Sequence, residues 1–195
     1  MSTIYLIRHG KTEANKRHLY YGSTDLPLCE EGVNELTTLR KLYPQTEHYH
    51  FITSGMKRTE QTLHLLFGAV PHTQDLRFRE MDFGSFEMKS YDQLKDQASY
   101  RMWLTGDHEA NLVPGGESGV QMRKRVLTAF AEVHHAGHDL VIICHGGPIA
   151  AIMAHLFPEE NKNRYDWQPG YGCGYELTCE VERWNYRRIE NPEGK

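Results

Sequence analysis

Short apolar runs alternate along the chain with longer segments in which apolar residues recur about once per helical turn. The apolar runs have the length of buried strands, and they cover residues 4–7, 49–52 and 140–143, with a last strand predicted at 175–181. The periodic segments predict amphipathic helices at residues 30–42, 59–67, 118–137 and 146–156. Ser118 and Gln121 have the spacing of a capping box at the start of the third helix.

Strands that alternate with helices favour an α/β fold in which most of the sheet is parallel. We therefore expect residues 1–195 to form one domain, a three-layer α/β/α sandwich with a mostly parallel central sheet. Residues 81–116 interrupt the alternation with an aromatic-rich stretch, a helical pattern over 91–104 and a loop over 111–116. This interruption predicts an inserted lid over the site, and its aromatic side chains belong either to a pocket or to the core.

Composition and charge narrow the possible partners. The formal net charge is −4 and the charges are not segregated, so neither nucleic acid nor a membrane surface is an expected partner. No apolar run approaches the roughly 20 residues of a membrane span. Four cysteines are too few for a disulfide scaffold and lack the spacing of a zinc ribbon. We expect free thiols in a reducing cytoplasm.

Basic side chains follow three of the predicted strands. The first strand runs into Arg8-His9-Gly10, the second is followed by Ser54 and Arg58, and the third ends in His145-Gly146-Gly147. Ligands bind at the carboxyl ends of strands in such sheets. The glycines would allow a ligand to approach the backbone closely, and the amides of the helix that begins at Gly146 favour an anion.

These strand ends are parts of a longer series of motifs. In chain order the motifs are residues 8–15 (RHGKTEAN), 22–28 (GSTDLPL) with Gly32, 53–62 (TSGMKRTEQT), 80–86 (EMDFGSF), 114–118 (PGGES) and 145–147 (HGG). Any one of them is weak, but six in this order are specific. The sequence resembles the histidine phosphatase superfamily, also called the phosphoglycerate-mutase-like family, over nearly the whole chain up to Leu156.

The resemblance implies a role for each motif residue. His9 is the expected nucleophile that becomes phosphorylated, and Glu80 is the expected general acid that later activates water. The groups expected to bind the phosphoryl oxygens are Arg8, Asn15, Arg58, His145 and Gly146. Neither a metal nor a cofactor is implied.

The chemistry is reasonable without the resemblance, because phosphoryl transfer needs mainly positioning and the cancellation of negative charge. Two guanidinium groups bind phosphate oxygens in forked geometry, so such a cluster can act in place of a metal. Nearby cations should lower the pKa of His9 and keep it neutral and nucleophilic. A buried position beside bound phosphate would favour the protonated form of Glu80.

Several of these assignments have competitors. Asp82 and Glu87 lie close enough to Glu80 to take its place as the acid. Asn15 could instead hold the turn after the first strand. The histidines at 134, 135 and 138 form a cluster, but cationic side chains are common near a helix end, so we do not expect a metal there. Three positions depart from the family pattern: Met88, where glycine is usual, Cys29, where a hydroxyl residue is usual, and Gly55, where a bulkier residue is common.

The favoured function is a metal-independent phosphomonoesterase that acts on a small phosphorylated metabolite through a phosphohistidine intermediate. The chain is short for the mutase branch, and residues 111–118 resemble the phosphatase branch. The alternative is a phosphoglycerate mutase, in which the phosphoryl group passes to a hydroxyl of a sugar acid. A third hypothesis is a catalytically silent protein that binds a phosphorylated ligand. The oligomeric state is left open between monomer and homodimer.

Overall fold

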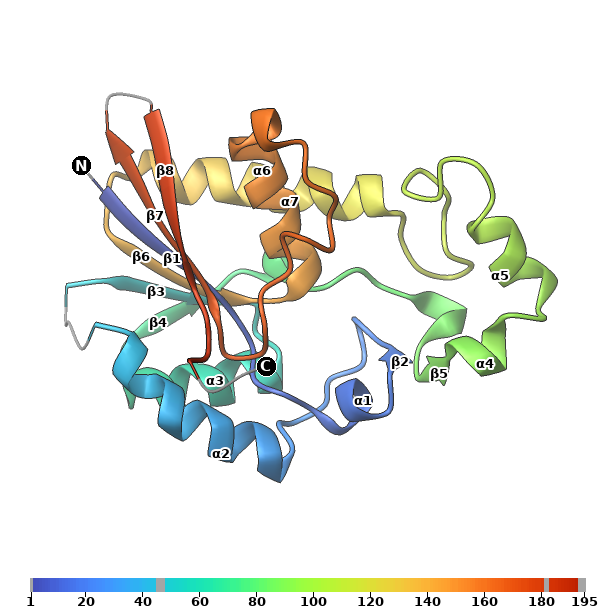
Figure 1. Ribbon diagram of the computed structural model, residues 1–195, viewed down its shortest axis with the longest axis horizontal. Coiled ribbons are helices and arrows are strands. Elements are labelled where there is room, and N and C mark those ends of the chain that lie inside the picture. The colour runs from blue at the N-terminus through green and yellow to red at the C-terminus, as the bar shows by residue number, and fades with distance from the viewer. Residues whose placement is uncertain (1, 45–47, 181–182, 193–195) are drawn as a thin grey trace.

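The computed structural model describes residues 2–44, 48–180 and 183–192. Its centre is a six-stranded sheet in the order β4-β3-β6-β1-β7-β8 (Figure 1). The strands are β1 (Ser2–Arg8), β3 (His50–Thr53), β4 (His72–Gln74), β6 (Leu140–Cys144), β7 (Gly174–Glu180) and β8 (Arg183–Ile189). The pairings β4–β3, β3–β6 and β6–β1 are parallel, whereas β7 is antiparallel to β1 and β8. The predicted mostly parallel sheet is confirmed.

Both edge strands escaped the sequence prediction. β4 has only exposed residues, and β8 alternates exposed polar residues with the half-buried Trp184 and Tyr186. Neither strand contains an apolar run, because an edge strand needs only one face, or none, against the core. The predicted last strand corresponds to β7, which begins one residue earlier at Gly174; its predicted end, Val181, lies outside the described residues.

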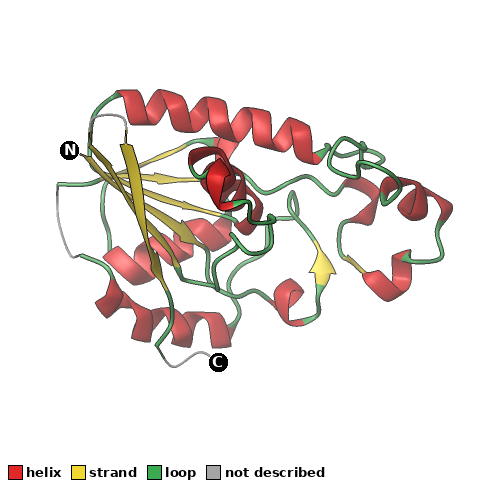
Figure 2. Ribbon diagram, turned by 45° about the horizontal axis from the view of Figure 1, so that its top comes forward, coloured by secondary structure: helices red, strands yellow, loops and turns green. Residues whose placement is uncertain are grey.

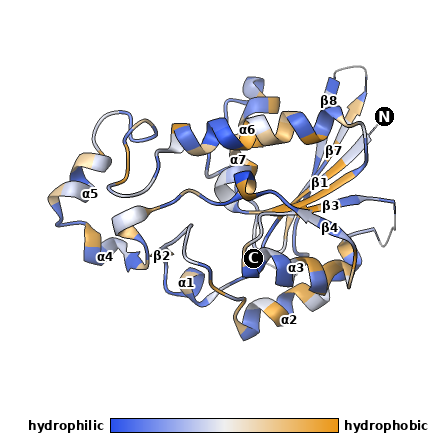
Figure 3. Cartoon of the chain, turned by 180° about the vertical axis from the view of Figure 1, so that it is seen from behind, coloured by the Kyte–Doolittle hydropathy of each residue, from blue (hydrophilic) through white to orange (hydrophobic). Residues whose placement is uncertain are grey.

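Helices cover both faces of the sheet (Figure 2). α2 (Glu30–Leu39) and α3 (Lys57–Phe67) pack on one face, and α6 (Gly119–His135) and α7 (Gly146–Leu156) pack on the other. Successive strand side chains alternate between these two cores. Figure 3 shows that hydrophobic residues concentrate in the central strands, while the helices carry both kinds. The predicted three-layer sandwich is therefore confirmed.

The helix boundaries follow local capping. Ser118 caps α6 with the predicted capping box to Gln121. α2 ends at Leu39 and continues as a 3₁₀ turn, η1 (Arg40–Leu42), so the predicted helix was too long by one turn. Cys29 stands at the N-cap of α2 and makes no side-chain capping bond there. Pro158 opens another 3₁₀ turn, η4 (Pro158–Glu160), directly after α7.

The interrupting segment forms a layer of short elements beside the sandwich (Figure 1). It contains η3 (Gly84–Phe86), β5 (Lys89–Ser90), α4 (Tyr91–Leu94) and α5 (Ala98–Trp103), and β5 pairs with β2 (Leu19–Tyr20). The helix expected over 91–104 is thus two helices, because Gln97 is extended between them. Phe86 and Tyr100 are buried in its core, whereas Tyr91 is exposed. Met88 has φ +61°, a conformation that favours glycine.

The remaining short elements are α1 (Glu13–Lys16) and the 3₁₀ turn η2 (Leu76–Phe78). Within the described ranges, no helix is long and apolar enough to cross a membrane. The four cysteines are free thiols. In the clustered histidines, His134 packs on Trp184 and His138 stacks on His50. The described part of the chain holds no group of three potential ligand side chains arranged around a metal position.

Candidate active site

The carboxyl ends of the neighbouring strands β1, β6 and β3 meet at one edge of the sheet. β1 leads directly into His9, β6 leads into His145 at the N-cap of α7, and β3 precedes α3, which carries Arg58. Parallel pairing therefore brings together residues that are far apart in the sequence. They line a cavity of about 270 Å³.

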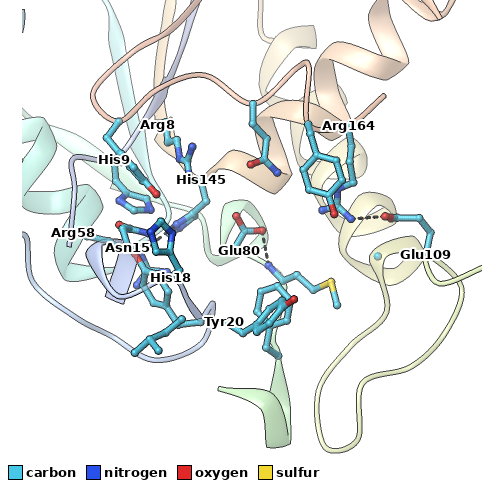
Figure 4. A pocket seen from close by; sticks show the side chains of 18 of the residues that line it. Arg8, His9, Asn15, His18, Tyr20, Arg58, Glu80, Glu109, His145 and Arg164 are labelled. Carbon is cyan, nitrogen blue, oxygen red and sulfur yellow. Dashed lines mark hydrogen bonds and ion pairs between the residues drawn. The ribbon is translucent and has the colours of Figure 1, made fainter. Parts of the chain in front are cut away.

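Six of the seven predicted site residues share this cavity (Figure 4). Its lining includes Arg8, His9, Asn15, Arg58, Glu80 and His145. Gly146 is not part of the lining. A Cβ atom there would lie 3.3 Å from Cζ of Arg8, so the glycine leaves room for the guanidinium group. Gly10 and Gly147 likewise make room for Leu36 and for the Glu80 carboxylate. These glycines serve the packing of the site's own side chains, rather than only the approach of a ligand.

The local contacts of His9 define its tautomer. Its imidazole is buried, and Nδ1 lies 2.7 Å from the carbonyl oxygen of Gly10. A carbonyl oxygen only accepts, so Nδ1 carries the hydrogen and Nε2 keeps a free lone pair. Burial, and then the positive charges of Arg58 and Arg8, lower the pKa of His9 well below its usual value. The imidazole is therefore neutral, with its nucleophilic nitrogen available.

His145 is held by contacts at both ring nitrogens. Arg58 Nε donates to its Nδ1 over 3.3 Å, so Nδ1 is unprotonated. Its Nε2 donates to Ser54 Oγ over 2.8 Å, and Ser54 Oγ lies 3.2 Å from Thr59 Oγ1. Thr59 donates in turn to the carbonyl oxygen of Met56 over 2.8 Å. Burial is the largest cause that lowers the pKa of His145 well below normal, followed by the charge of Arg58.

Arg58 is 1% exposed, yet within the described residues no carboxylate lies in ion-pair contact with it. Its Nη1 and Nη2 donate to the carbonyl oxygens of Thr24 and Gly22, over 3.0 and 2.8 Å. Glu87 holds this loop, because its carboxylate accepts from the amides of Gly22 and Thr24 over 2.7 and 3.1 Å. Glu87 therefore organises the loop that holds Arg58, and it does not line the cavity.

Arg8 also lacks a carboxylate partner among the described residues. Its Nη1 donates to the carbonyl oxygen of Pro169 over 2.8 Å, and its guanidinium carbon lies 4.1 Å from the ring centroid of Tyr171. Its Nε is buried without a hydrogen-bond partner. A buried donor without a partner is costly, and two unneutralised guanidinium groups beside one cavity favour an anion.

Backbone donors hold the carboxylate of Glu80 at the cavity. The amides of Gly147 and Met81 donate to Oε2 and Oε1, each over 2.9 Å. Arg125 of α6 donates over 2.9 Å to the carbonyl oxygen of Glu80. Asp82, the other predicted competitor, accepts from Gly84 and does not line the cavity. Glu80 is thus the acidic side chain among these three that reaches the histidines' cavity.

Asn15 holds the turn after β1 and also lines the cavity. Its Oδ1 accepts from the Thr12 amide over 3.0 Å, which closes the capping box of α1, and from Tyr21 over 2.9 Å. No described group accepts from its Nδ2, so this amide can donate into the cavity. Ser54, Thr59, Glu87 and Arg125 were missed as supporting residues. Ser54 and Thr59 fall inside the motif at residues 53–62, and Glu87 directly follows the motif at residues 80–86.

A mostly parallel α/β sandwich with two neutral imidazoles and two unpaired guanidinium groups in one cavity is typical of enzymes that act on phosphate esters. A family model described as histidine phosphatase superfamily, branch 1, matches residues 4–192. The chain belongs to this superfamily.

The individual relatives include phosphatases and a mutase. Adenosylcobalamin/alpha-ribazole phosphatase of Salmonella typhimurium is 30% identical over 97% of this chain and 99% of its own length. Probable phosphoglycerate mutase GpmB of Salmonella paratyphi C is 28% identical over 79% of this chain and 74% of its own length. The crystal structure of a putative alpha-ribazole-5'-P phosphatase from Escherichia coli superposes with a TM-score of 0.88 over 97% of this chain and 96% of that one. At 22% identity this structure shows the fold alone. Family and relatives together place the chain with the phosphoric monoester hydrolases.

Proposed function

We propose that this phosphatase hydrolyses its ester in two steps at the cavity between His9, His145, Arg8 and Arg58. The observation that carries the proposal is the convergence of a free imidazole lone pair with two guanidinium groups, the partly buried Arg8 and the buried Arg58, that have no carboxylate partner among the described residues. Such a cavity binds the phosphoryl group by charge-assisted hydrogen bonds. It also supplies a nucleophile beside the bound phosphorus.

In the first step, Nε2 of His9 attacks phosphorus and the ester P–O bond breaks. Glu80 gives its proton to the departing alkoxide, which leaves as the alcohol. In the second step Glu80 takes a proton from water, the water oxygen attacks phosphorus and the P–N bond breaks. Inorganic phosphate and the starting form of His9 result. Neither step requires a metal ion, because Arg8, Arg58 and His145 stabilise the charge of the transferring group.

Other predicted residues contribute to binding the phosphoryl group. Asn15 donates from Nδ2, the one polar group of its amide that the capping box leaves unused. Gly146 contributes through its position at the start of α7, where the helix dipole favours an anion. A cytoplasmic location stays a prediction, supported by the four free thiols.

We propose alpha-ribazole 5'-phosphate as the natural substrate. The support is the similarity to an alpha-ribazole phosphatase over nearly the full length of both chains. The cavity lining also includes the aromatic side chains of Tyr20, Trp103 and Tyr165, and these suit a planar leaving group. The mutase alternative is supported by a similarity that covers less of both chains, and it is therefore the weaker of the two.

A turnover assay tests the proposal. Alpha-ribazole 5'-phosphate and p-nitrophenyl phosphate should both release phosphate, and an added chelator should leave the rates unchanged. Interconversion of 2- and 3-phosphoglycerate that exceeds phosphate release would instead establish the mutase. An absence of turnover across a panel of phosphate esters, combined with tight phosphate binding, would establish a silent binding protein.

A further inference from the structure

A second cavity of about 320 Å³ lies against the catalytic one. Five residues line both cavities and so form the wall between them: His108, Glu109, Gly119, Arg164 and Tyr165. The second cavity extends between α6 and α7, where its lining includes Met122, Ala150, Ala151 and Ala154. We call it the alanine chamber. It has no part in the chemistry proposed above.

An ion pair stands in the shared wall. Arg164 Nη1 contacts Glu109 Oε1, and His108 Nε2 lies 3.4 Å from the same carboxylate oxygen. The side chains of Arg164 and Glu109 are 28% and 37% exposed. An ion pair with this much exposure contributes little to stability, so it can open at a small cost. Opening it would join the two cavities.

Gly119 shows how closely the wall is packed. It is the first residue of α6, and a Cβ atom there would lie 2.2 Å from Glu109 Oε2. The Val120 amide donates over 3.0 Å to the carbonyl oxygen of Glu109. The carboxylate therefore rests on the amino end of α6, where the helix dipole favours it. The helix dipole therefore adds a small preference for the closed ion pair.

The wall lies on the side of the site where the alcohol leaves. Glu80 protonates the leaving oxygen in the proposed mechanism, and in Figure 4 Glu80 lies between the His9–His145 group and the Glu109–Arg164 pair. Gly147, which donates to Glu80 over 2.9 Å, also lines the alanine chamber. Trp103 also lines the catalytic cavity, and its buried Nε1 has no hydrogen-bond partner in the described part of the chain. A leaving group that extends past Glu80 therefore meets the wall.

We infer that the Glu109–Arg164 pair is a gate, and that the alanine chamber binds the bulky apolar end of the leaving alcohol. The inference rests on the proposed function, because it places the phosphoryl group at His9 and the alcohol beyond Glu80. Small side chains on α7 leave the chamber open, and burial of apolar surface there strengthens substrate binding.

A homologous series of primary alkyl phosphates isolates this effect, since the leaving-group chemistry is constant and only the length of the tail changes. Full burial of one methylene is worth about a fourfold gain in affinity. We expect kcat/KM for octyl phosphate to exceed that for ethyl phosphate by about tenfold or more. Ala154→Phe fills the chamber from an exposed position of α7 and should bring this ratio close to one. His155→Phe, next to it and outside the lining, should keep the wild-type ratio.

Glu109→Ala removes the gate and should raise the octyl-to-ethyl ratio above that of the wild type. A wild-type ratio near one, or an unchanged ratio in Ala154→Phe, would overturn the chamber. A lower ratio in Glu109→Ala would overturn the gate. Binding of ethyl- and octylphosphonate, which cannot be hydrolysed, separates the two proposals. Tighter binding of octylphosphonate without hydrolysis of any ester contradicts the proposed function alone, whereas hydrolysis without any preference for length contradicts the chamber alone.

Discussion

Arg58 and His145 are joined by a hydrogen bond of 3.3 Å from the guanidinium Nε to the imidazole Nδ1. This bond requires an unprotonated Nδ1, and the hydroxyl of Ser54 supplies the matching acceptor for the hydrogen on Nε2. The orientation of His145 and the direction of the Arg58 fork are therefore set together. Ser54 acts on the site through His145 and does not line the cavity.

Ser54→Ala should disturb this arrangement while leaving His9 intact. The buried Nε2 hydrogen of His145 would lose its acceptor, which costs about 1–3 kcal/mol, and the other tautomer would place a hydrogen against Arg58. We expect kcat to fall about tenfold, with a changed pH profile. Nitrogen chemical shifts of the His145 ring report the tautomer directly. Thr59→Ser keeps the hydroxyl that lies beside Ser54 Oγ and should retain the wild-type chemical shifts. An unchanged His145 tautomer in Ser54→Ala would show that Ser54 does not set it.

The acid can be identified by comparing Glu80 with Glu87. Glu80→Gln should slow an alkyl phosphate by about 10²-fold or more and p-nitrophenyl phosphate far less, because a good leaving group needs no proton. Glu87→Gln should affect both esters alike, since Glu87 holds the loop of Gly22 and Thr24 that supports Arg58. Steady-state kinetics with the two esters measures this difference. The assignment fails if Glu87→Gln, rather than Glu80→Gln, discriminates between them.

The buried histidines make stability depend on pH. Both have folded-state pKa values well below the usual value, so below about pH 6.5 the unfolded chain binds more protons than the folded one. The contribution of these two histidines to the free energy of unfolding is fully present above this pH and is lost as the pH is lowered. Each of His9 and His145 should contribute a loss of up to about 1.5 kcal/mol between pH 6.5 and 5.

Urea unfolding at pH 6.5 and pH 5 measures this loss. His145→Gln should reduce the difference between the two pH values by the share of one histidine. His155→Gln, at an exposed position of α7, should keep the wild-type difference. An equal pH effect in wild type and His145→Gln would show that folding does not lower the pKa of His145.

Cys29 offers a test of helix capping that does not involve the site. It occupies the N-cap of α2 without a side-chain capping bond. Cys29→Ser should raise the free energy of unfolding by about 1 kcal/mol, because serine is a preferred N-cap residue and its oxygen can accept from the first turn. Cys29→Ala lacks the oxygen and should give no gain in denaturant unfolding. Equal stabilities for the serine and alanine variants would contradict the capping argument.

The sequence predicted the parts of the fold that leave a local pattern. The buried strand β6 is a continuous apolar run and the helices α6 and α7 have periodic apolar residues, and all three were identified. The edge strands β4 and β8 have no such pattern, because pairing at an edge requires only backbone hydrogen bonds. The break between α4 and α5 depends on the extended backbone of Gln97. No residue in that stretch is of a type that predicts such a break.

In the site, too, the sequence identified the residues with a local pattern and missed the contacts between distant segments. The motif residues could be named from the sequence because they occur in a fixed order, and parallel pairing then placed His9 beside His145. The contacts that orient them join distant segments, such as Ser54 with His145 or Arg125 with the carbonyl oxygen of Glu80. No local pattern reports which side chain will accept or donate across such a distance. The wall of Glu109 and Arg164 was missed for the same reason.

The most direct test of the account is to trap the covalent intermediate. The enzyme is mixed with a rapidly cleaved phosphate ester and quenched in alkali, because phosphohistidine is labile in acid, and the phosphorylated residue is then located by mass spectrometry. The account predicts a single phosphoryl group on Nε2 of His9, absent from His9→Ala. Phosphorylation of another residue, or sustained phosphate release by His9→Ala, would contradict it.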